Sequence, residues 1–304
     1  MNAQSRRFRA VDFLYLCIMI LPLICAMALK VCFSVSGEGV QIAGAQIYFT
    51  IPMPLMDMPF TEAQVNSWMV IISVWGLCLF MTHGLKVKAD TRRQHLAEWC
   101  VTMCKKLVNE NMGEFFAGYT PFIGAIMAIS LLSSLMSLLG LFAPTSDLNV
   151  VAGWAILVFA LITAAKCRCG PLLYMKSFCE PIPVMLPMNI ISELATPISM
   201  AFRHYGNVMS GAVISVLISS ALSSLSRMVL GWLPGVLGDI PFLRVGIPAV
   251  LSIYFDVFSG CLQAFIFAML TMLYVSGGFP MEEYLRRKAA DKQPAKKQSV
   301  RLFE

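Results

Sequence analysis

The amino-acid sequence predicts an all-α polytopic membrane protein of about six membrane segments, the last two forming a hairpin of long, strongly tilted helices. Of its 304 residues, 58% are hydrophobic and only 13% are charged, and the mean hydropathy is +0.73. Soluble chains carry roughly 25% charged and about 45–50% apolar residues. The composition therefore excludes a soluble enzyme, a disordered protein and a nucleic-acid binder.

Four ordinary membrane spans come first along the chain. They are stretches without Asp, Glu, Lys or Arg, at residues 13–29, 63–85, 115–146 and 148–165. The first follows a basic start and therefore has the pattern of a cleaved signal peptide as well as that of a span. Its apolar run of seventeen residues is long for a signal peptide, so a retained span is the favoured interpretation.

Two much longer apolar stretches follow, at about residues 187–232 and 245–284, each interrupted by only a few charges. Forty helical residues reach about 60 Å, which is twice the ~30 Å hydrocarbon core of a bilayer. Each arm must therefore be tilted, kinked or partly broken. This length predicts the final hairpin.

Lys and Arg are concentrated in the regions that six crossings place on one side of the membrane. Residues 1–10, 86–106, 166–176 and the tail from 286 hold 19 of the 23. The positive-inside rule therefore places both termini in the cytoplasm. No transit peptide appears, which favours a bacterial inner membrane. We expect three parts, namely an N-terminal span with an outer loop (1–62), a membrane domain (63–286) and a disordered basic tail (287–304).

The remaining polar segment, residues 86–114, has helical periodicity. Leu96, Trp99, Met103 and Leu107 recur on one face, which predicts an amphipathic helix at the inner membrane surface. No nucleotide-binding glycine loop, HExxH or GxSxG element occurs. The cysteines lie mostly inside apolar runs, where they act as small hydrophobic residues. Neither a cofactor nor a metal site is expected.

Charged residues inside the long arms are the most informative feature of the sequence. The first arm holds Glu193, Arg203 and Arg227, and the second holds Asp256. A charge at the bilayer centre costs about 2.5–3.5 kcal/mol on insertion scales, and such residues mark ion paths, proton relays or counter-ions. Arg203 cannot lose its proton at any usable pH. It is a permanent cation, and the alternative roles for it are an interface anchor or a structural ion pair.

The neighbours of Arg203 strengthen a functional interpretation. Asn207 and Ser210 follow at helical spacing on about the same face. Gly206 and Gly211 carry no side chain, which lets a neighbouring helix approach closely. We therefore expect this face of the first arm to be a contact surface.

The second arm carries a polar stripe. Ser252, Asp256, Ser259 and Gln263 stand at i, i+4, i+7 and i+11 of an otherwise apolar helix. Such a stripe either joins two helices by hydrogen bonds or lines a water-filled half-passage. The ionisable member, Asp256, favours the passage.

Glu193 and Asp256 lie on opposite sides of Arg203 along the predicted hairpin. Glu193 precedes the arginine by ten residues, or about 15 Å of helix toward the inner side, whereas Asp256 belongs to the arm that returns from outside. Two offset half-passages separated by a fixed cation need a moving ion carrier between them. The sequence supplies no candidate carrier, so we expect a partner to provide it.

Four motifs in order carry a family resemblance. Residues 197–211 resemble the P-x-S-L-x-x-R-L-x-G-N-x-x-A-G signature of F-type ATP synthase subunit a. Residues 262–274 resemble its last-helix motif, and residues 140–150 resemble its loop after an earlier span. Gln94 and Glu98 also fit, so that the match runs from about residue 62 to 285.

The resemblance implies a non-catalytic stator subunit that abuts a rotating ring of c subunits, each with a membrane-embedded carboxylate. Arg203 faces that ring in this family, and Asn207 and Gln263 are its polar neighbours. Asp256 takes the outer half-channel position and Glu193 the inner one. The peripheral-stalk b subunits and the rest of the synthase are the other implied partners. The ion, a proton or sodium, enters along the Asp256 stripe and leaves past Glu193.

His204 departs from the family pattern, which has leucine after the arginine. It points about 100° away from Arg203 on a helix, so we interpret it as a packing or lipid-interface residue. Ala212 and Ser137 also stand where the family commonly has other residues, an acid or histidine and an asparagine or aspartate respectively.

Two other functions stay open at this stage. A secondary transporter or channel would use Arg203 to bind an anion, although no inverted repeat relates the two halves of the sequence. An intramembrane enzyme would use Asp256, Glu193 or His204 as acid–base groups, although no paired motif stands on adjacent turns.

Overall fold

The computed structural model describes residues 3–32, 44–54, 57–87, 91–168, 170–178, 183–230, 250–251, 253–286 and 288. Within these residues, six helices are long and apolar enough to cross a membrane. The predicted all-α polytopic membrane fold is confirmed. Residues 231–249, most of the basic tail and Ser252 lie outside the described part, so the predictions made for them stay untested.

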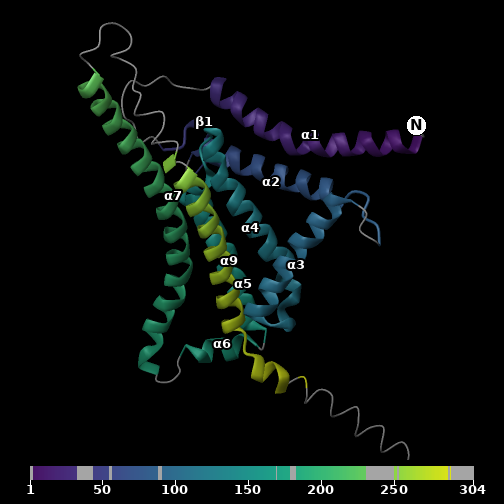
Figure 1. The fold of residues 1–304 in the computed structure, drawn as a ribbon. Helices are drawn as coiled ribbons and strands as arrows, with labels where there is room; N and C mark the ends of the chain where they lie inside the picture. Colours follow the sequence, from purple (N-terminus) through teal and green to yellow (C-terminus); the bar gives the residue numbers. More distant parts are fainter. Residues whose placement is uncertain are drawn as a thin grey trace, which may run out of the picture.

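The four ordinary spans lie where the sequence predicts them. They are α1 (Ala3–Cys32), α2 (Glu62–Thr82), a continuous helical unit around α4 (Thr120–Leu135), and α5 (Leu148–Cys167). Short 3₁₀ turns extend α4 at both ends, η1 (Glu114–Tyr119) and η2 (Met136–Leu139). Figure 1 shows α4 and α5 at the centre of the molecule, with α1 and α2 to one side.

Polar caps define where several helices begin. Thr61 and Thr91 each accept a hydrogen bond from the backbone N–H three residues later, and Asp147 accepts one from the N–H two residues later. These side chains satisfy donors that the first helical turn leaves unpaired. The caps explain why α2, α3 and α5 begin at the residues they do.

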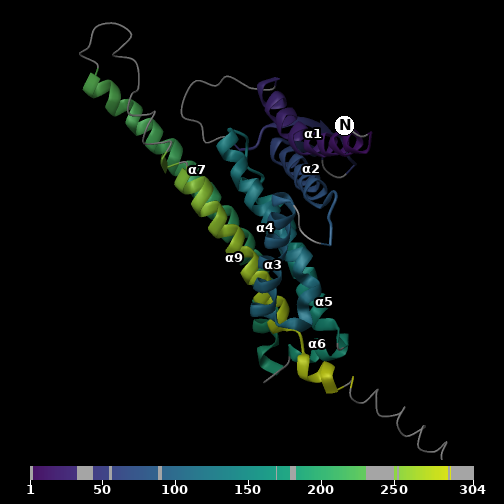
Figure 2. The same ribbon diagram turned by 45° about the vertical axis from the view of Figure 1, so that its right-hand side comes forward.

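The first long arm is a single helix, α7 (Leu186–Leu230), of 45 residues with Pro197 inside it. At 1.5 Å per residue it is about 68 Å long. The second arm begins with a π-helix, η6 (Ile253–Ser259), and continues as α9 (Gly260–Gly278). Its continuous apolar helix, Ile253–Gly278, has 26 residues and ends before the predicted residue 284. The two arms run side by side (Figure 2).

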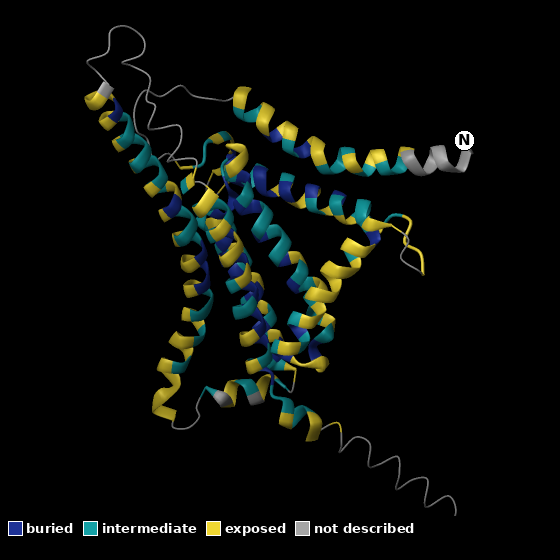
Figure 3. Cartoon of the chain, viewed as in Figure 1, coloured by how far each residue is buried: buried dark blue, intermediate teal, exposed yellow. Residues whose placement is uncertain are grey.

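The main hydrophobic core lies between α4, α5 and α9. Its fully buried members include Ile123, Val158, Phe267 and Met272, and α7 contributes Met200 and Ala201. Figure 3 shows the resulting contrast, because α9 has a buried face whereas α7 is mostly intermediate or exposed along its length. The hairpin therefore has one packed arm and one uncovered arm.

Glycines allow several close helix approaches. A Cβ on Gly76 would lie 2.8 Å from the Met19 backbone nitrogen of α1, and a Cβ on Gly260 would lie 2.8 Å from Ser134 Cβ of α4. A Cβ on Gly211 would lie 3.2 Å from Phe255. The predicted close approach at Gly211 is therefore confirmed, and the approaching element is η6.

The N-terminal helix is fixed at both ends to the rest of the molecule. Asp12 Oδ1 lies 3.0 Å from Arg93 Nη1 and 2.8 Å from His83 Nδ1. At the other end, Lys30 Nζ donates a hydrogen bond to the Gly140 carbonyl. Helix α1 therefore packs on α2 as part of this fold, and its retention in the mature protein stays a prediction.

Helix α3 (Arg92–Met112) occupies the segment for which an amphipathic helix is predicted. Its buried residues are Gln94, Val108 and Met112, whereas Leu96, Trp99 and Met103 are exposed. Three of the four predicted stripe residues therefore point away from the described protein, whereas the fourth, Leu107, packs against the main hydrophobic core. An uncovered apolar stripe is typical of a helix that lies against a membrane surface.

A two-stranded sheet, which the sequence analysis did not predict, closes the outer loop. Strand β1 (Ile47–Ile51) pairs antiparallel with β2 (Met58–Thr61), and the rings of Phe49 and Phe60 stack with centroids 4.6 Å apart. Strand β2 runs directly into α2, so the hairpin sits on the end of that span (Figure 1).

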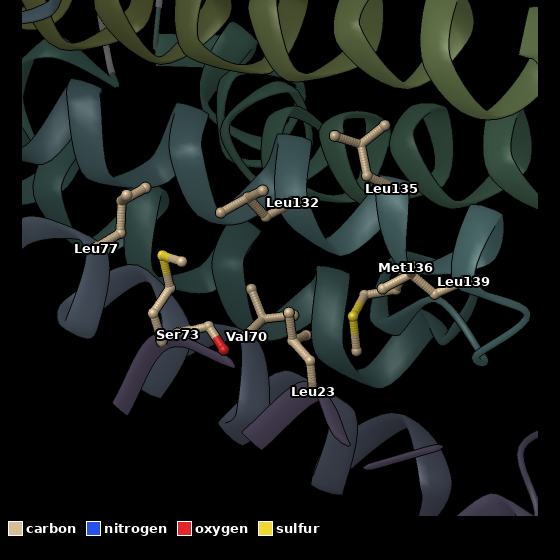
Figure 4. Close-up of a pocket in the computed structure, with 9 residues that line it drawn as sticks. Leu23, Val70, Ser73, Leu77, Leu132, Leu135, Met136 and Leu139 are labelled. Carbon is tan, nitrogen blue, oxygen red and sulfur yellow. The ribbon is translucent and has the colours of Figure 1, made fainter. Parts of the chain in front are cut away.

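An apolar pocket of about 200 Å³ lies between α1, α2 and α4. Figure 4 shows its lining, in which Ser73 is the only polar side chain among leucine, valine and methionine. A pocket without exposed polar atoms cannot hold a hydrated ion. We therefore do not place the functional site there.

Candidate functional site

Arg203 lies on the uncovered side of α7. Its side chain is exposed, and it makes no hydrogen bond or ion pair to the part of the chain that the structure describes. Gly206 and Ser210, one and two turns further on, are exposed as well, and no described atom lies within 4 Å of a Cβ built on Gly206. This face therefore presents a permanent cation with little steric cover.

His204, the next residue, points into the protein and is fully buried. Its ring lies edge-on to Trp154 of α5 and Phe267 of α9, with centroids 5.9 and 5.5 Å away. Its Nε2 lies 3.4 Å from the Ser130 hydroxyl of α4. The packing interpretation of His204 is therefore confirmed and the lipid-interface interpretation is wrong. The imidazole anchors the turn of α7 that displays Arg203.

Asn207 joins the two arms of the hairpin. Its Nδ2 donates to Ser259 Oγ at 2.7 Å, and Ser210 Oγ donates to the Asn207 backbone carbonyl at 3.1 Å. One turn further along α7, Gly211 lies in close contact with Phe255. For Ser259, the structure therefore shows the hydrogen-bonded joining of helices that the sequence left as one of two alternatives.

Asp256 lies in the middle of the π-helix η6 and is half-buried. The predicted regular stripe on one α-helical face is wrong here, because i→i+5 hydrogen bonding changes the direction in which successive side chains point. Phe255, within this segment, lies close to Gly211, and Gly260, directly after the segment, lies close to Ser134. Gln263, in α9, is buried. Single π-helical turns are frequent at functional sites.

Glu193 lies in a charged cluster that joins three helices, which we call the inner cluster (Lys166, Tyr174 and Glu193). Lys166 Nζ, in the last turn of α5, donates to both carboxylate oxygens at 2.6 and 2.7 Å. Tyr174, in α6 (Pro171–Ser177), donates its hydroxyl to Glu193 Oε1 at 3.3 Å. Burial and the negative charge of Glu193 raise the pKa of the Tyr174 phenol above its ordinary value. The phenol therefore remains a donor at neutral pH.

A family model described as ATP synthase A chain matches residues 64–276, which is well over half of the sequence. This chain belongs to that family. A relative from Propionigenium modestum, named "ATP synthase subunit a, sodium ion specific", is 29% identical over 276 residues, covering 80% of this chain and 88% of the relative. "ATP synthase subunit a 3" of Pelobacter propionicus is 31% identical over 221 residues, covering 71% and 86%.

The resemblance to F-type ATP synthase subunit a is therefore confirmed. This subunit a is a multi-pass membrane component of an ATP synthase. The matched range contains every residue that the sequence analysis assigned to ion translocation, namely Glu193, Arg203, Asn207, Ser210, Asp256, Ser259 and Gln263.

The structure brings some of these residues together and adds others to the subunit a site. It places Asn207 against Ser259, whereas Glu193 contacts Lys166 and Tyr174. Sequence reasoning counted Lys166 only among the solvated inner charges and did not single out Tyr174. The available signal was topological, since the end of α5 and the start of α7 face the same side of the membrane.

Proposed function

We propose that this subunit a is the non-catalytic stator of an F-type ATP synthase and provides two ion half-channels to a rotating ring of c subunits. The observation that carries the proposal is the exposed Arg203, unpaired within the described chain and backed by the buried His204. A fixed cation on an uncovered face needs a negatively charged partner in the membrane. A carboxylate on each ring subunit is that partner.

Arg203 acts by charge alone. A ring carboxylate that reaches it loses its ion, because the guanidinium stabilises the ionised form. The empty carboxylate then moves on and is reloaded from the other half-channel before it returns through lipid. Arg203 keeps its own proton throughout, so ions do not pass directly from one half-channel to the other. Each unit charge that crosses 100 mV supplies about 2.3 kcal/mol.

The two half-channels are assigned to the two carboxylates of the hairpin. Asp256, on the π-helical segment, serves the outer side, with Ser259, Gln263, Asn207 and Ser210 as the polar surroundings. Glu193 serves the inner side. The positive-inside distribution of Lys and Arg supports cytoplasmic termini and a bacterial inner membrane. The ring touches the Arg203 face, and the peripheral-stalk b subunits and the rest of the synthase complete the assembly.

Arg203→Ala tests the proposal in membranes that contain the whole synthase. We expect the complex to assemble but ATP-driven ion pumping and ATP synthesis to be abolished. Arg227→Gln is the matched control, because Arg227 lies on the same helix in an exposed position near its end and should change pumping little. Near-normal coupling in Arg203→Ala would refute the stator role.

Reconstitution separates this function from a secondary transporter or channel. Subunit a alone, in vesicles, should move no solute, whereas the purified assembly should contain a ring oligomer and a soluble ATPase. Anion transport by the isolated chain would instead favour the transporter. Repeating the pumping assay with and without sodium at several pH values identifies the ion.

A further inference from the structure

The inner cluster contains a close, partly buried ion pair between Lys166 and Glu193. Lys166 Nζ contacts both oxygens of Glu193 at 2.6 and 2.7 Å. The two side chains are only 24% and 20% exposed. Exposed ion pairs contribute little because water screens them, whereas a pair as covered as this one influences each partner strongly.

The ammonium group of Lys166 is held in place by its surroundings. The Lys166 side chain packs so closely on Gly278 of α9 that a Cβ there would lie 2.9 Å from Lys166 Cε. Lys166 Nζ also lies 5.9 Å from the centre of the Tyr174 ring, within the range of a cation–π contact. Packing contacts therefore hold the ion pair in place where α5, α7 and α9 meet.

A cavity of about 240 Å³ opens beside the pair between these three helices. Its lining includes Lys166, Glu193, Thr196, Tyr274 and Gly277. A cavity of this size with charged walls has room for several water molecules. An ion that reaches Glu193 from the Arg203 side, along α7, therefore meets both a carboxylate and an ammonium.

We infer that Lys166 is a positioning residue that controls release at the inner exit, holding Glu193 ionised and repelling each cation that arrives there. This inference rests on the proposed function. An arriving proton forms an O–H bond on Glu193 and breaks one Lys166 contact. The proton then passes to water on the inner side, and the contact forms again. Lys166 keeps its own proton throughout, and a sodium ion would compete with it for the same two oxygens.

The groups that face Glu193 from each packed element are few. Lys166 comes from α5, Tyr174 from α6 and Tyr274 from α9, while Thr196 of α7 does not titrate. Tyr174 is neutral at physiological pH, because burial and Glu193 raise its pKa. Among these cluster and cavity-lining residues, Lys166 is therefore the sole basic side chain beside the carboxylate.

Lys166→Met tests the inference in membrane vesicles that carry the full complex, stripped of its soluble ATPase for passive conductance. We expect inward-side proton release to slow, so that conductance per assembled complex at neutral pH falls about tenfold, the factor for about 1.4 kcal/mol of charge interaction. Conductance should recover as the pH rises, because a lower proton concentration on the inner side favours release. Lys166→Arg should keep most of the wild-type conductance and its pH profile.

Two further variants make the test decisive. Lys106→Met is the matched control, since Lys106 is 68% exposed and pairs only with Glu110 at 3.8 Å; it should behave as wild type. In a Glu193→Gln background, Lys166→Met should have no further effect. A purely structural Lys166 would lower conductance by the same factor at every pH, and that outcome, or wild-type conductance in Lys166→Met, overturns the inference.

Arg203→Ala in the same vesicles separates this inference from the proposed function. If that variant retains coupled pumping, the stator role itself fails. If it abolishes pumping while Lys166→Met behaves as wild type, only the role of Lys166 fails.

Discussion

The two arms of the hairpin are equally apolar but are covered very differently. Both arms are apolar enough to cross a membrane. In the most apolar stretch of each arm, 39% of the η6–α9 residues are buried among the described residues, but only 6% of the α7 residues are. Hydropathy therefore predicts that both arms enter the membrane but not which neighbour each one meets. The described residues pack around α9, whereas they leave most of the surface of α7 uncovered.

The same contrast appears between adjacent residues within α7. Arg203 is exposed, whereas His204 is buried against α4, α5 and α9. A helix turns by about 100° per residue, so one face can be anchored while the next presents a charge. The uncovered arm is thus held rigidly at the position where its charge matters.

Two glycine substitutions, one on each arm, should show the largest difference between the arms. In Gly260→Leu, the new side chain meets Ser134 on α4, and overpacking at a helix contact should abolish accumulation of the folded chain. In Gly206→Leu, the side chain enters open space in this chain, so the chain should fold but lose coupled pumping. Quantifying folded subunit and pumping in the same membranes checks both, and equal losses of fold would contradict the comparison.

Alanine substitution of one phenylalanine on each arm should show the next largest difference. Phe267 is fully buried in α9, so Phe267→Ala should lower the free energy of unfolding by about 3–5 kcal/mol. Phe202 of α7 is 55% exposed, and its alanine variant should stay within about 0.5 kcal/mol. Denaturant unfolding of the purified chain in detergent measures both values. A large cost for Phe202→Ala would mean that α7 is packed within the chain after all.

Loss of the hydrogen bond between the arms should have a smaller effect. Asn207→Ala removes the 2.7 Å contact to Ser259 Oγ, and interhelical hydrogen bonds in membranes contribute about 0.6 kcal/mol on average. Ser259→Ala should lose a similar amount. The double variant should be no worse than either single one, and additive losses would show that the two residues act separately.

Tyr174→Phe should have the smallest effect and should concern pH. Because the folded pKa of this phenol is raised, the stability it contributes is complete below the ordinary tyrosine pKa of about 10 and is lost as the pH rises through the folded value. The variant should therefore lose at neutral pH only the small contribution of the 3.3 Å hydrogen bond to Glu193, and it should lose less stability than wild type in strong alkali. Unfolding curves at neutral and alkaline pH test this, and a difference confined to neutral pH would contradict it.

Much of the fold could be predicted from the sequence because membrane spans obey a simple length rule. The four ordinary spans, α3 and the length of α7 follow from apolar runs and periodicity. The outer β-hairpin could not be predicted, since two strands of four and five residues carry too little pattern. The π-helix at Asp256 was missed because it depends on close contacts with two other helices, which a single segment does not encode.

The candidate site could be predicted in part for the same reason. Charges inside apolar runs, such as Arg203 and Glu193, are visible in the sequence without any alignment. Lys166 was missed because it lies at a helix end, where a basic residue is ordinary. Its importance depends on which carboxylate reaches it, and only the packing of α5 against α7 decides that.

The uncovered guanidinium of Arg203 also bears on how the cell makes this protein. A newly inserted copy that has not yet joined its complex has to keep a charge in lipid that nothing in its described residues neutralises. Such an orphan is the less stable form of the chain, so membrane proteases and insertion factors have a physical basis for telling it from the assembled one. If the proposed ring carboxylate is the partner of Arg203, biogenesis of this subunit is tied to the supply of that ring.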